Sequence, residues 1–170
     1  MLLPPDYPFT VARVPHLGGN PGTKATVRAM RAMVEEFKSD PLILRAAVGI
    51  VYLMPEHSQH AEAEALFNYV RDFVRYVRDP VGLESLTIPP VVLQRQVGDC
   101  DDQSTLLATL LEAVGYPTRF VLAGYQSRDY EHVFLETFVN GEWFACDPIL
   151  KQFAFGNEAP APLSRWVERG

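Results

Sequence analysis

Three side chains that can share one acyl-transfer reaction occur in the order Cys100, His132 and Asp147. Cys100 follows Gly98-Asp99 and precedes a long amphipathic run, so the sequence predicts it at the N-terminus of a helix. The helix dipole and the unpaired backbone N–H groups at such an end favour a thiolate. A thiolate beside an imidazole that a carboxylate orients provides a nucleophile, a general base and an orienting residue.

The turn Asn140-Gly141 predicts how His132 and Asp147 meet. Asn-Gly is the strongest short signal for a β-hairpin with a two-residue turn. Such a turn fixes the register of the flanking strands, and side chains alternate between the two faces of a strand. His132 and Asp147 then lie on one face as diagonal neighbours, with Cα atoms roughly 7–8 Å apart. If the predicted helix N-terminus packs against this hairpin, Cys100 meets His132.

The second cysteine, Cys146, is expected to point away from this pair. It directly precedes Asp147, so its side chain lies on the opposite face of the strand. A Cys100–Cys146 disulfide is therefore not expected, and two cysteines fit a reducing compartment.

Metal binding is the other chemistry open to these residue types, but structural zinc uses closely spaced Cys and His pairs, so we expect no metal and no cofactor. The ligands of that alternative would be Cys100, Asp101, Asp102, His132 and Asp147.

Two stretches carry a family resemblance: GDCDDQSTLLATLLEAVGYPTRFV (98–121) and EHVFLETFVNGEWFACDP (131–148). They combine Gly-x-Cys at a helix start, a strand of the form G-Y-P-T-R-F-V, and a His followed by a hairpin, a Trp and Asp-Pro. This combination resembles the transglutaminase-like superfamily of papain-type cysteine enzymes, over roughly residues 66–148. The resemblance implies that Cys100 is the nucleophile, His132 the general base and acid, and Asp147 the orienting residue. It also implies acyl transfer at an amide of a peptide-like or cell-wall substrate through a thioester, by hydrolysis, deamidation or transamidation.

The oxyanion of such a reaction needs hydrogen-bond donors. The backbone N–H of Cys100 is one candidate. Papain-type enzymes often place a Gln six residues before the cysteine, and Gln94 stands there, with Gln96 as its competitor. The resemblance therefore implies Gln94 as an oxyanion-binding side chain.

The segment YVRDPVGLESL (76–86) is similar to segments in transglutaminase-like proteins of tailed bacteriophages. This narrower resemblance implies an alternative function, that of a structural virion component at a tail tip or baseplate. Other virion proteins would then be partners, bound through the N-terminal residues. The N-terminus lacks the pattern of a signal peptide, so we expect the protein to be cytoplasmic when synthesised and, in the alternative, incorporated into a virion.

The elements that must position these residues follow from the spacing of apolar residues. Residues 83–97 are expected to form a loop that leads into a short extended piece. Several helices followed by one helix and an antiparallel meander indicate an α+β fold with helices on one face of the sheet. The predicted helices cover residues 23–39, 41–54, 60–78 and 100–114, and the predicted strands cover residues 118–124, 132–139 and 142–147.

The composition fits a globular protein, since 48% of the 170 residues are hydrophobic and 21% are charged. The net charge of −6 argues against a nucleic-acid surface, which needs clustered basic residues. The longest apolar stretch, 41–54, is interrupted by Arg45 and is too short to span a bilayer, so no membrane insertion is expected. We expect a single transglutaminase-like domain, consisting of a Pro/Gly-rich arm (1–22), a helical part (23–80), a catalytic core (81–150) and a tail (151–170).

Overall fold

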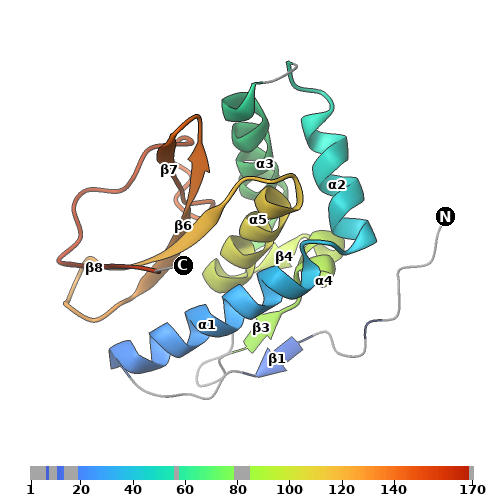
Figure 1. Cartoon of the computed structure of the whole chain (residues 1–170). Coiled ribbons are helices and arrows are strands. Elements are labelled where there is room, and N and C mark those ends of the chain that lie inside the picture. Colours follow the sequence, from blue (N-terminus) through green and yellow to red (C-terminus); the bar gives the residue numbers. More distant parts are fainter. Residues whose placement is uncertain (1–6, 8–10, 14–18, 56–57, 79–84, 169–170) are drawn as a thin grey trace.

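The computed structural model describes residue 7 and residues 11–13, 19–55, 58–78 and 85–168 of the chain (Figure 1). Most of the predicted arm lies outside these residues. Within the described ranges, no helix is both long enough and apolar enough to cross a membrane.

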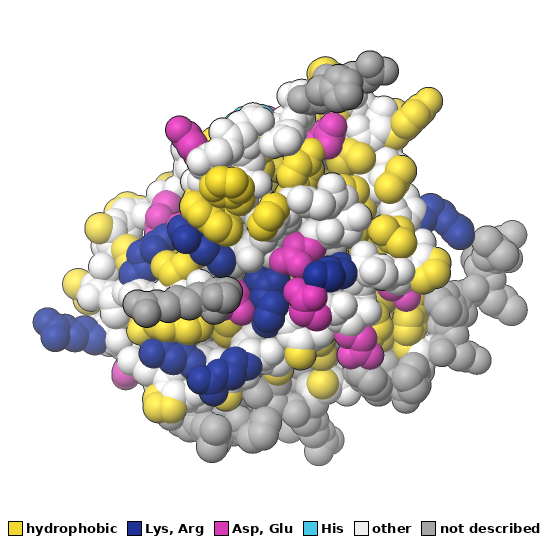
Figure 2. All heavy atoms as spheres, viewed as in Figure 1, with side chains coloured by type: hydrophobic (Ala, Val, Ile, Leu, Met, Phe, Trp, Pro, Cys, Tyr) yellow, Lys and Arg dark blue, Asp and Glu magenta, His cyan; other side chains and the backbone are white. Residues whose placement is uncertain are grey.

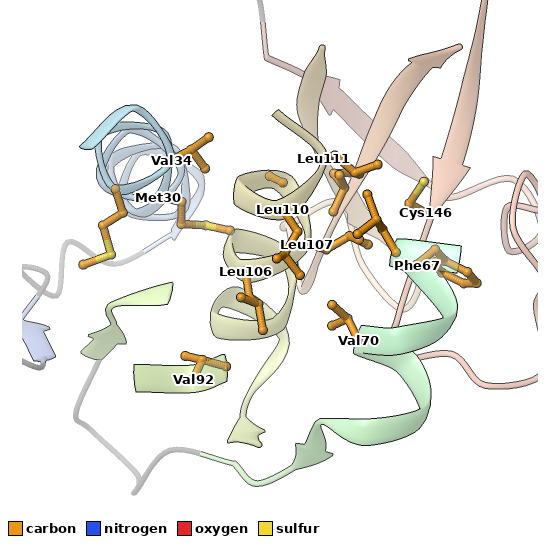
Figure 3. Packing of buried hydrophobic residues seen from close by; sticks show 14 of the residues in the cluster. Met30, Val34, Phe67, Val70, Val92, Leu106, Leu107, Leu110, Leu111 and Cys146 are labelled. Carbon is orange, nitrogen blue, oxygen red and sulfur yellow. The ribbon is translucent and has the colours of Figure 1, made fainter. Parts of the chain in front are cut away.

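Helix α5 (Cys100–Ala113) is the central helix, and four further helices contact it. Residues 102–111 of α5 are all buried, as expected for a helix that other elements surround. Leu107 and Leu110 belong to the same core as Phe67 and Met30, which come from two of the neighbouring helices (Figure 3). These neighbours are α1 (Gly19–Phe37), α2 (Pro41–Val51), α3 (Gln59–Phe73) and α4 (Pro89–Arg95).

A four-stranded antiparallel sheet packs beside the helices (Figure 1). Its strands, in spatial order, are β7 (Glu142–Cys146), β6 (His132–Val139), β5 (Thr118–Gly124) and β8 (Ser164–Val167). The predicted register of the β6–β7 hairpin is confirmed, because Val139 pairs with Glu142 and Leu135 with Cys146. The predicted α+β fold class is confirmed as well.

The two faces of the sheet carry separate hydrophobic clusters. Leu135 and Cys146 join the main core, in which Figure 3 shows Cys146, whereas Phe134 and Ala145 form a smaller cluster on the other face. Cys146 is fully buried, and both cysteines are free thiols. The expectation that Cys146 is separate from the His132 face and forms no disulfide is therefore confirmed.

Part of the predicted arm is tied to the body of the chain. Strand β1 (Val11–Arg13) pairs antiparallel with β3 (Ser85–Thr87). The Tyr7 hydroxyl donates a hydrogen bond to Asp40 Oδ2 over 3.2 Å. Helix α1 begins at Gly19, four residues before the predicted start, so the described arm ends in a helix instead of continuing as irregular chain.

Two predictions for the segment before α5 were wrong. The third helix ends at Phe73 rather than near residue 78, because β2 (Arg75–Tyr76) pairs in parallel with β4 (Val97–Gly98). Residues 89–95 form helix α4 rather than a loop. Two prolines begin α4, and proline is tolerated in a first helical turn because its missing N–H has no intrahelical partner there.

Candidate active site

His132 and Asp147 are in direct contact, as the hairpin register predicts. His132 Nε2 lies 2.6 Å from Asp147 Oδ2. The other carboxylate oxygen, Oδ1, accepts hydrogen bonds from the backbone N–H groups of Ile149 and Leu150, at 3.1 and 3.3 Å. Asp147 is buried, so these three contacts fix the carboxylate in one orientation.

The imidazole of His132 is also held by neighbouring rings. It stacks on Phe134 with ring centroids 6.1 Å apart and lies 6.4 Å from the ring of Tyr125. Because Nε2 is engaged with the carboxylate, Nδ1 is the ring nitrogen that remains for proton exchange with another group. The hairpin thus supplies an oriented imidazole.

Cys100 is the first residue of α5, as the sequence predicts, and Asp99 caps this helix. Asp99 Oδ1 accepts the backbone N–H groups of Asp101 and Asp102, both at 3.1 Å. The N–H of Cys100 lies outside this cap and is one of the donors that a helix start leaves without an intrahelical acceptor. It is therefore suitably placed to bind the negative charge that develops on the oxygen of a carbonyl group whose carbon bonds to the sulfur.

One hydrogen bond joins the start of α5 to the start of β6. The buried Ser104 hydroxyl donates to the backbone carbonyl of Val133 over 3.4 Å. Ser104 lies one helical turn after Cys100, on the same side of α5, and Val133 directly follows His132. The nucleophile candidate and the base candidate therefore belong to the same end of the helix–sheet interface.

The Cys100 thiol itself contacts a carboxylate. Its Sγ is hydrogen-bonded to Asp101 Oδ1 at 3.5 Å, and no hydrogen bond in the described part of the chain joins it to His132. Burial, together with the charges of Asp101 and Asp99, raises the pKa of Cys100 well above that of an ordinary thiol. The expectation that the helix start yields a thiolate is thus wrong for this conformation, because burial and adjacent carboxylates outweigh the helix dipole.

The two glutamines considered as oxyanion donors are both exposed. Gln94 lies in the last turn of α4, and Gln96 caps that helix in the left-handed conformation, with φ 53°. Neither of them is hydrogen-bonded to Cys100 among the residues that the structure describes. The role assigned to Gln94 stays a prediction.

Two polar residues after Cys100 have structural roles that the sequence did not reveal. The buried Asp102 accepts the backbone N–H of Thr87 over 2.7 Å, which links α5 to β3. The buried Gln103 donates from Nε2 to the carbonyl of Gly98 over 3.0 Å and so holds the strand that leads into Cys100. The sequence shows that both residues are polar, but their hydrogen-bond partners depend on the fold.

Two surface cavities of the described residues lie at the opposite end of β5. One cavity of about 470 Å³ and one of about 750 Å³ share Thr118 and Arg119 in their walls, and neither contains a residue of the predicted triad. Arg31 lines the smaller cavity and forms ion pairs with Glu112 and Glu168. Figure 2 shows interleaved acidic and basic side chains on this face. Because these charges are paired with each other, we assign this region a structural role.

The residues that surround the triad do not form an evident metal centre. Among the described residues, no group of three or more His, Cys, Asp or Glu side chains is arranged to hold a metal ion. Cys100, His132 and Asp147 are instead the residue types of nucleophilic catalysis with proton transfer, and His132 and Asp147 are the two of them in contact.

Comparison with known proteins identifies the family. The model of the transglutaminase-like superfamily matches residues 51–148, more than half of the chain. No curated protein matches the sequence.

Several solved structures resemble the fold. A protein from Cytophaga hutchinsonii, to which cysteine protease activity is ascribed, matches with 14% identity, a TM-score of 0.53 and 84% of this chain covered. A protein from Parabacteroides distasonis, to which protease activity is ascribed, has 14% identity, a TM-score of 0.57 and 82% coverage. Calcium-bound LapG from Legionella pneumophila has 18% identity, a TM-score of 0.50 and 72% coverage of both chains.

These structures share the fold at low sequence identity, and this chain covers 52% of the first and 27% of the second. The match to the family model includes Cys100, His132 and Asp147, the residues that the resemblance singled out. The chain belongs to the transglutaminase-like superfamily.

Proposed function

We propose that the protein is a cysteine-dependent acyl transferase or hydrolase that acts on an amide bond of a peptide-like substrate. Cys100 is the nucleophile, His132 the general base and acid, and Asp147 the orienting residue. The observation that carries this proposal is the 2.6 Å contact between His132 Nε2 and Asp147 Oδ2, at the end of the sheet that Ser104 joins to the start of α5.

The reaction begins as the Cys100 thiol gives its proton to His132 Nδ1 in the same step in which the sulfur attacks. The sulfur attacks the amide carbonyl, and the N–H of Cys100 donates to the oxyanion that forms. The protonated imidazole gives its proton to the leaving amine as the C–N bond breaks, which leaves a thioester on Cys100. A water molecule or a second amine then attacks the thioester while His132 takes its proton, and the thiol is released with that proton.

Asp147 supports both halves of this cycle. Its carboxylate fixes which nitrogen of His132 faces the thiol, and it stabilises the imidazolium that forms in each half. The two backbone N–H groups on Oδ1 keep the carboxylate in place.

The raised pKa of Cys100 favours proton transfer within the attack step over a preformed thiolate. The sulfur of Cys100 therefore has to break its hydrogen bond with Asp101 before it contacts the imidazole of His132. We expect substrate binding to cause this rearrangement, because it changes the surroundings of the thiol.

An activated p-nitrophenyl ester tests the proposal, because acylation of Cys100 releases one equivalent of nitrophenol in a burst. We expect the burst to disappear in Cys100→Ala and to remain in Cys146→Ala, whose thiol is buried on the helix side of the sheet. In His132→Ala the acylation rate should fall by about 10²–10⁴. Acylation of His132→Ala at the wild-type rate contradicts the assignment of the base.

A further inference from the structure

Tyr125 carries a buried hydroxyl on the face of the sheet that holds His132. The residue directly follows β5, and its side chain packs with Ala123 and Phe134 in the smaller hydrophobic cluster. The hydroxyl oxygen is buried and has no hydrogen-bond partner within the described residues. A buried hydroxyl without a partner costs free energy, so we expect this one to have a role other than stability.

The ring of Tyr125 is in contact with the proposed base. Ala123 pairs with His132 in the β5–β6 ladder, and Tyr125 stands two residues after Ala123, on the same face. The ring centroids of Tyr125 and His132 lie 6.4 Å apart, with the ring planes inclined by 44°. The phenol and the imidazole are therefore direct neighbours.

The carboxylate of Asp147 lies within electrostatic reach of the Tyr125 hydroxyl. Burial raises the pKa of Tyr125, the charges of Asp147 and then Glu158 raise it further, and Arg165 lowers it. Glu158 is paired with Arg165 over 3.2 Å, whereas Asp147 is buried beside His132. Of the two carboxylates, Asp147 is thus the one that acts more strongly on the phenol.

Asp147 can accept one more hydrogen bond. A carboxylate offers about four acceptor positions on its two oxygens. Among the described residues, Oδ1 accepts the N–H groups of Ile149 and Leu150, and Oδ2 contacts His132 Nε2. The remaining position belongs to Oδ2, the oxygen that orients the imidazole.

We propose that Tyr125 is a positioning residue whose hydroxyl donates a hydrogen bond to Asp147 Oδ2 when the thiol, the imidazole and the carboxylate come together. The inference rests on the proposed function and adds a residue to it. The hydroxyl fixes Oδ2 and takes up part of its negative charge, so His132 keeps its orientation while its proton moves. Before this step the Cys100 sulfur is bonded to Asp101, so both contacts await one rearrangement.

Matched Tyr→Phe variants test this role. In Tyr125→Phe the acylation rate with the p-nitrophenyl ester should fall by about 2–10-fold, because the catalytic arrangement loses one hydrogen bond. The stability of this variant in urea should not fall, since its hydroxyl has no partner to lose among the described residues. Tyr116→Phe is the control, because the Tyr116 hydroxyl donates to Glu62 at the opposite end of β5. It should lose stability and acylate at the wild-type rate.

The pH dependence of acylation provides a readout that a packing role would not change. His132 accepts the thiol proton only as a neutral imidazole, so the rate rises with pH on the acid side of the profile. Without the Tyr125 hydroxyl, the full charge of Asp147 stabilises the imidazolium, and this acid limb should move to higher pH. Glu158→Gln should leave the limb in place. The same movement in Glu158→Gln would assign the hydroxyl to Glu158 and overturn the inference.

A measurement without turnover separates this inference from the proposed function. Alkylation of Cys100 by iodoacetamide replaces the S–H group, so the sulfur loses its hydrogen bond with Asp101. The proton between His132 Nε2 and Asp147 Oδ2, which lie 2.6 Å apart, should give a downfield NMR signal that His132→Ala lacks. In alkylated Tyr125→Phe this signal should lie further downfield than in the alkylated wild type, because Asp147 is then the stronger acceptor.

The two failures give different results. If the wild type shows no burst that depends on Cys100, the proposed function fails, and the NMR signal alone decides whether the Tyr125 hydroxyl bonds to Asp147. If the burst is present, equal acylation rates or equal signals in Tyr125→Phe and the wild type overturn the inference and leave the proposed function intact.

Discussion

The Ser104 hydroxyl lies 3.4 Å from the carbonyl oxygen of Val133, one helical turn beyond Cys100 and one residue beyond His132. This hydrogen bond connects the helix that carries the proposed nucleophile to the strand that carries the proposed base. Both partners are buried, so neither has water as a substitute. The alignment of the two halves of the site therefore depends on a residue that takes no part in the chemistry.

Ser104→Ala tests this connection. The variant leaves the carbonyl of Val133 without its partner, and the free energy of unfolding should fall by about 1–3 kcal/mol in urea denaturation. The acylation rate should fall as well, because the distance between thiol and imidazole is no longer fixed. Ser127→Ala, which removes an exposed hydroxyl that contacts Glu131, serves as the control. Equal stability of Ser104→Ala and wild type would contradict the importance of this bond.

Asp101→Asn should lower the pKa of Cys100. The negative charge of Asp101 disfavours the thiolate and raises the pKa of the thiol, so its removal shifts the pKa downwards. At a fixed pH below the pKa the thiolate fraction then rises, and the rate of alkylation by iodoacetamide rises with it. The midpoint of the rate–pH profile should move to lower pH, yet stay above about 8.5 because the thiol remains buried.

The control for this change is Asp129→Asn, an exposed carboxylate in the loop between β5 and β6. It should leave the alkylation profile as it is. A profile that does not move in Asp101→Asn would mean that the charge of Asp101 does not raise the pKa of Cys100.

Gly98→Ala should destabilise the protein. A Cβ atom at Gly98 would lie 2.7 Å from Asp102 Cβ and 3.2 Å from its Oδ2, so Asp102 has to move and its hydrogen bond with Thr87 is strained. We expect the free energy of unfolding to fall by about 1–3 kcal/mol. Gly49→Ala is the opposite case, since nothing lies within 4 Å of a Cβ there, and it should stabilise α2 by about 0.5–1 kcal/mol. Similar effects of both changes would refute the close approach at Gly98.

Tyr125→Phe should leave the stability unchanged or raise it by about 1 kcal/mol. The Tyr125 hydroxyl is buried and has no hydrogen-bond partner among the described residues, so the variant removes an unsatisfied group. Tyr116→Phe is the matched control, because the Tyr116 hydroxyl donates to Glu62 and its loss should lower the stability by about 1–2 kcal/mol. Chemical denaturation of both variants distinguishes the two cases. Destabilisation by Tyr125→Phe would indicate a bound water molecule at this hydroxyl.

The parts of the site that depend on local sequence were predictable. Asn140 and Gly141 both adopt positive φ, at 52° and 88°, and this turn sets the register that brings His132 to Asp147. The helix cap at Asp99 and the left-handed conformation of Gly115 after α5 also depend on local sequence alone.

The parts that depend on distant partners were not predictable. Strand β2 ends the third helix early because it pairs with β4, twenty-two residues further along the chain, and only this pairing places Tyr76 beside the nucleophile. Strand β8 is recognisable only through its pairing with β5. The pKa of Cys100 depends on burial, which the sequence does not give. The role in a virion stays a prediction.

Strand β8 has a consequence for how the protein is made. Its residues 164–167 are synthesised after the whole hairpin that holds His132 and Asp147, and until they arrive the outer edge of β5 has unpaired N–H and C=O groups. A nascent or proteolysed chain that stops before Ser164 exposes this apolar edge to other copies. The same four residues therefore protect the completed molecule from edge-to-edge aggregation once they have paired with β5.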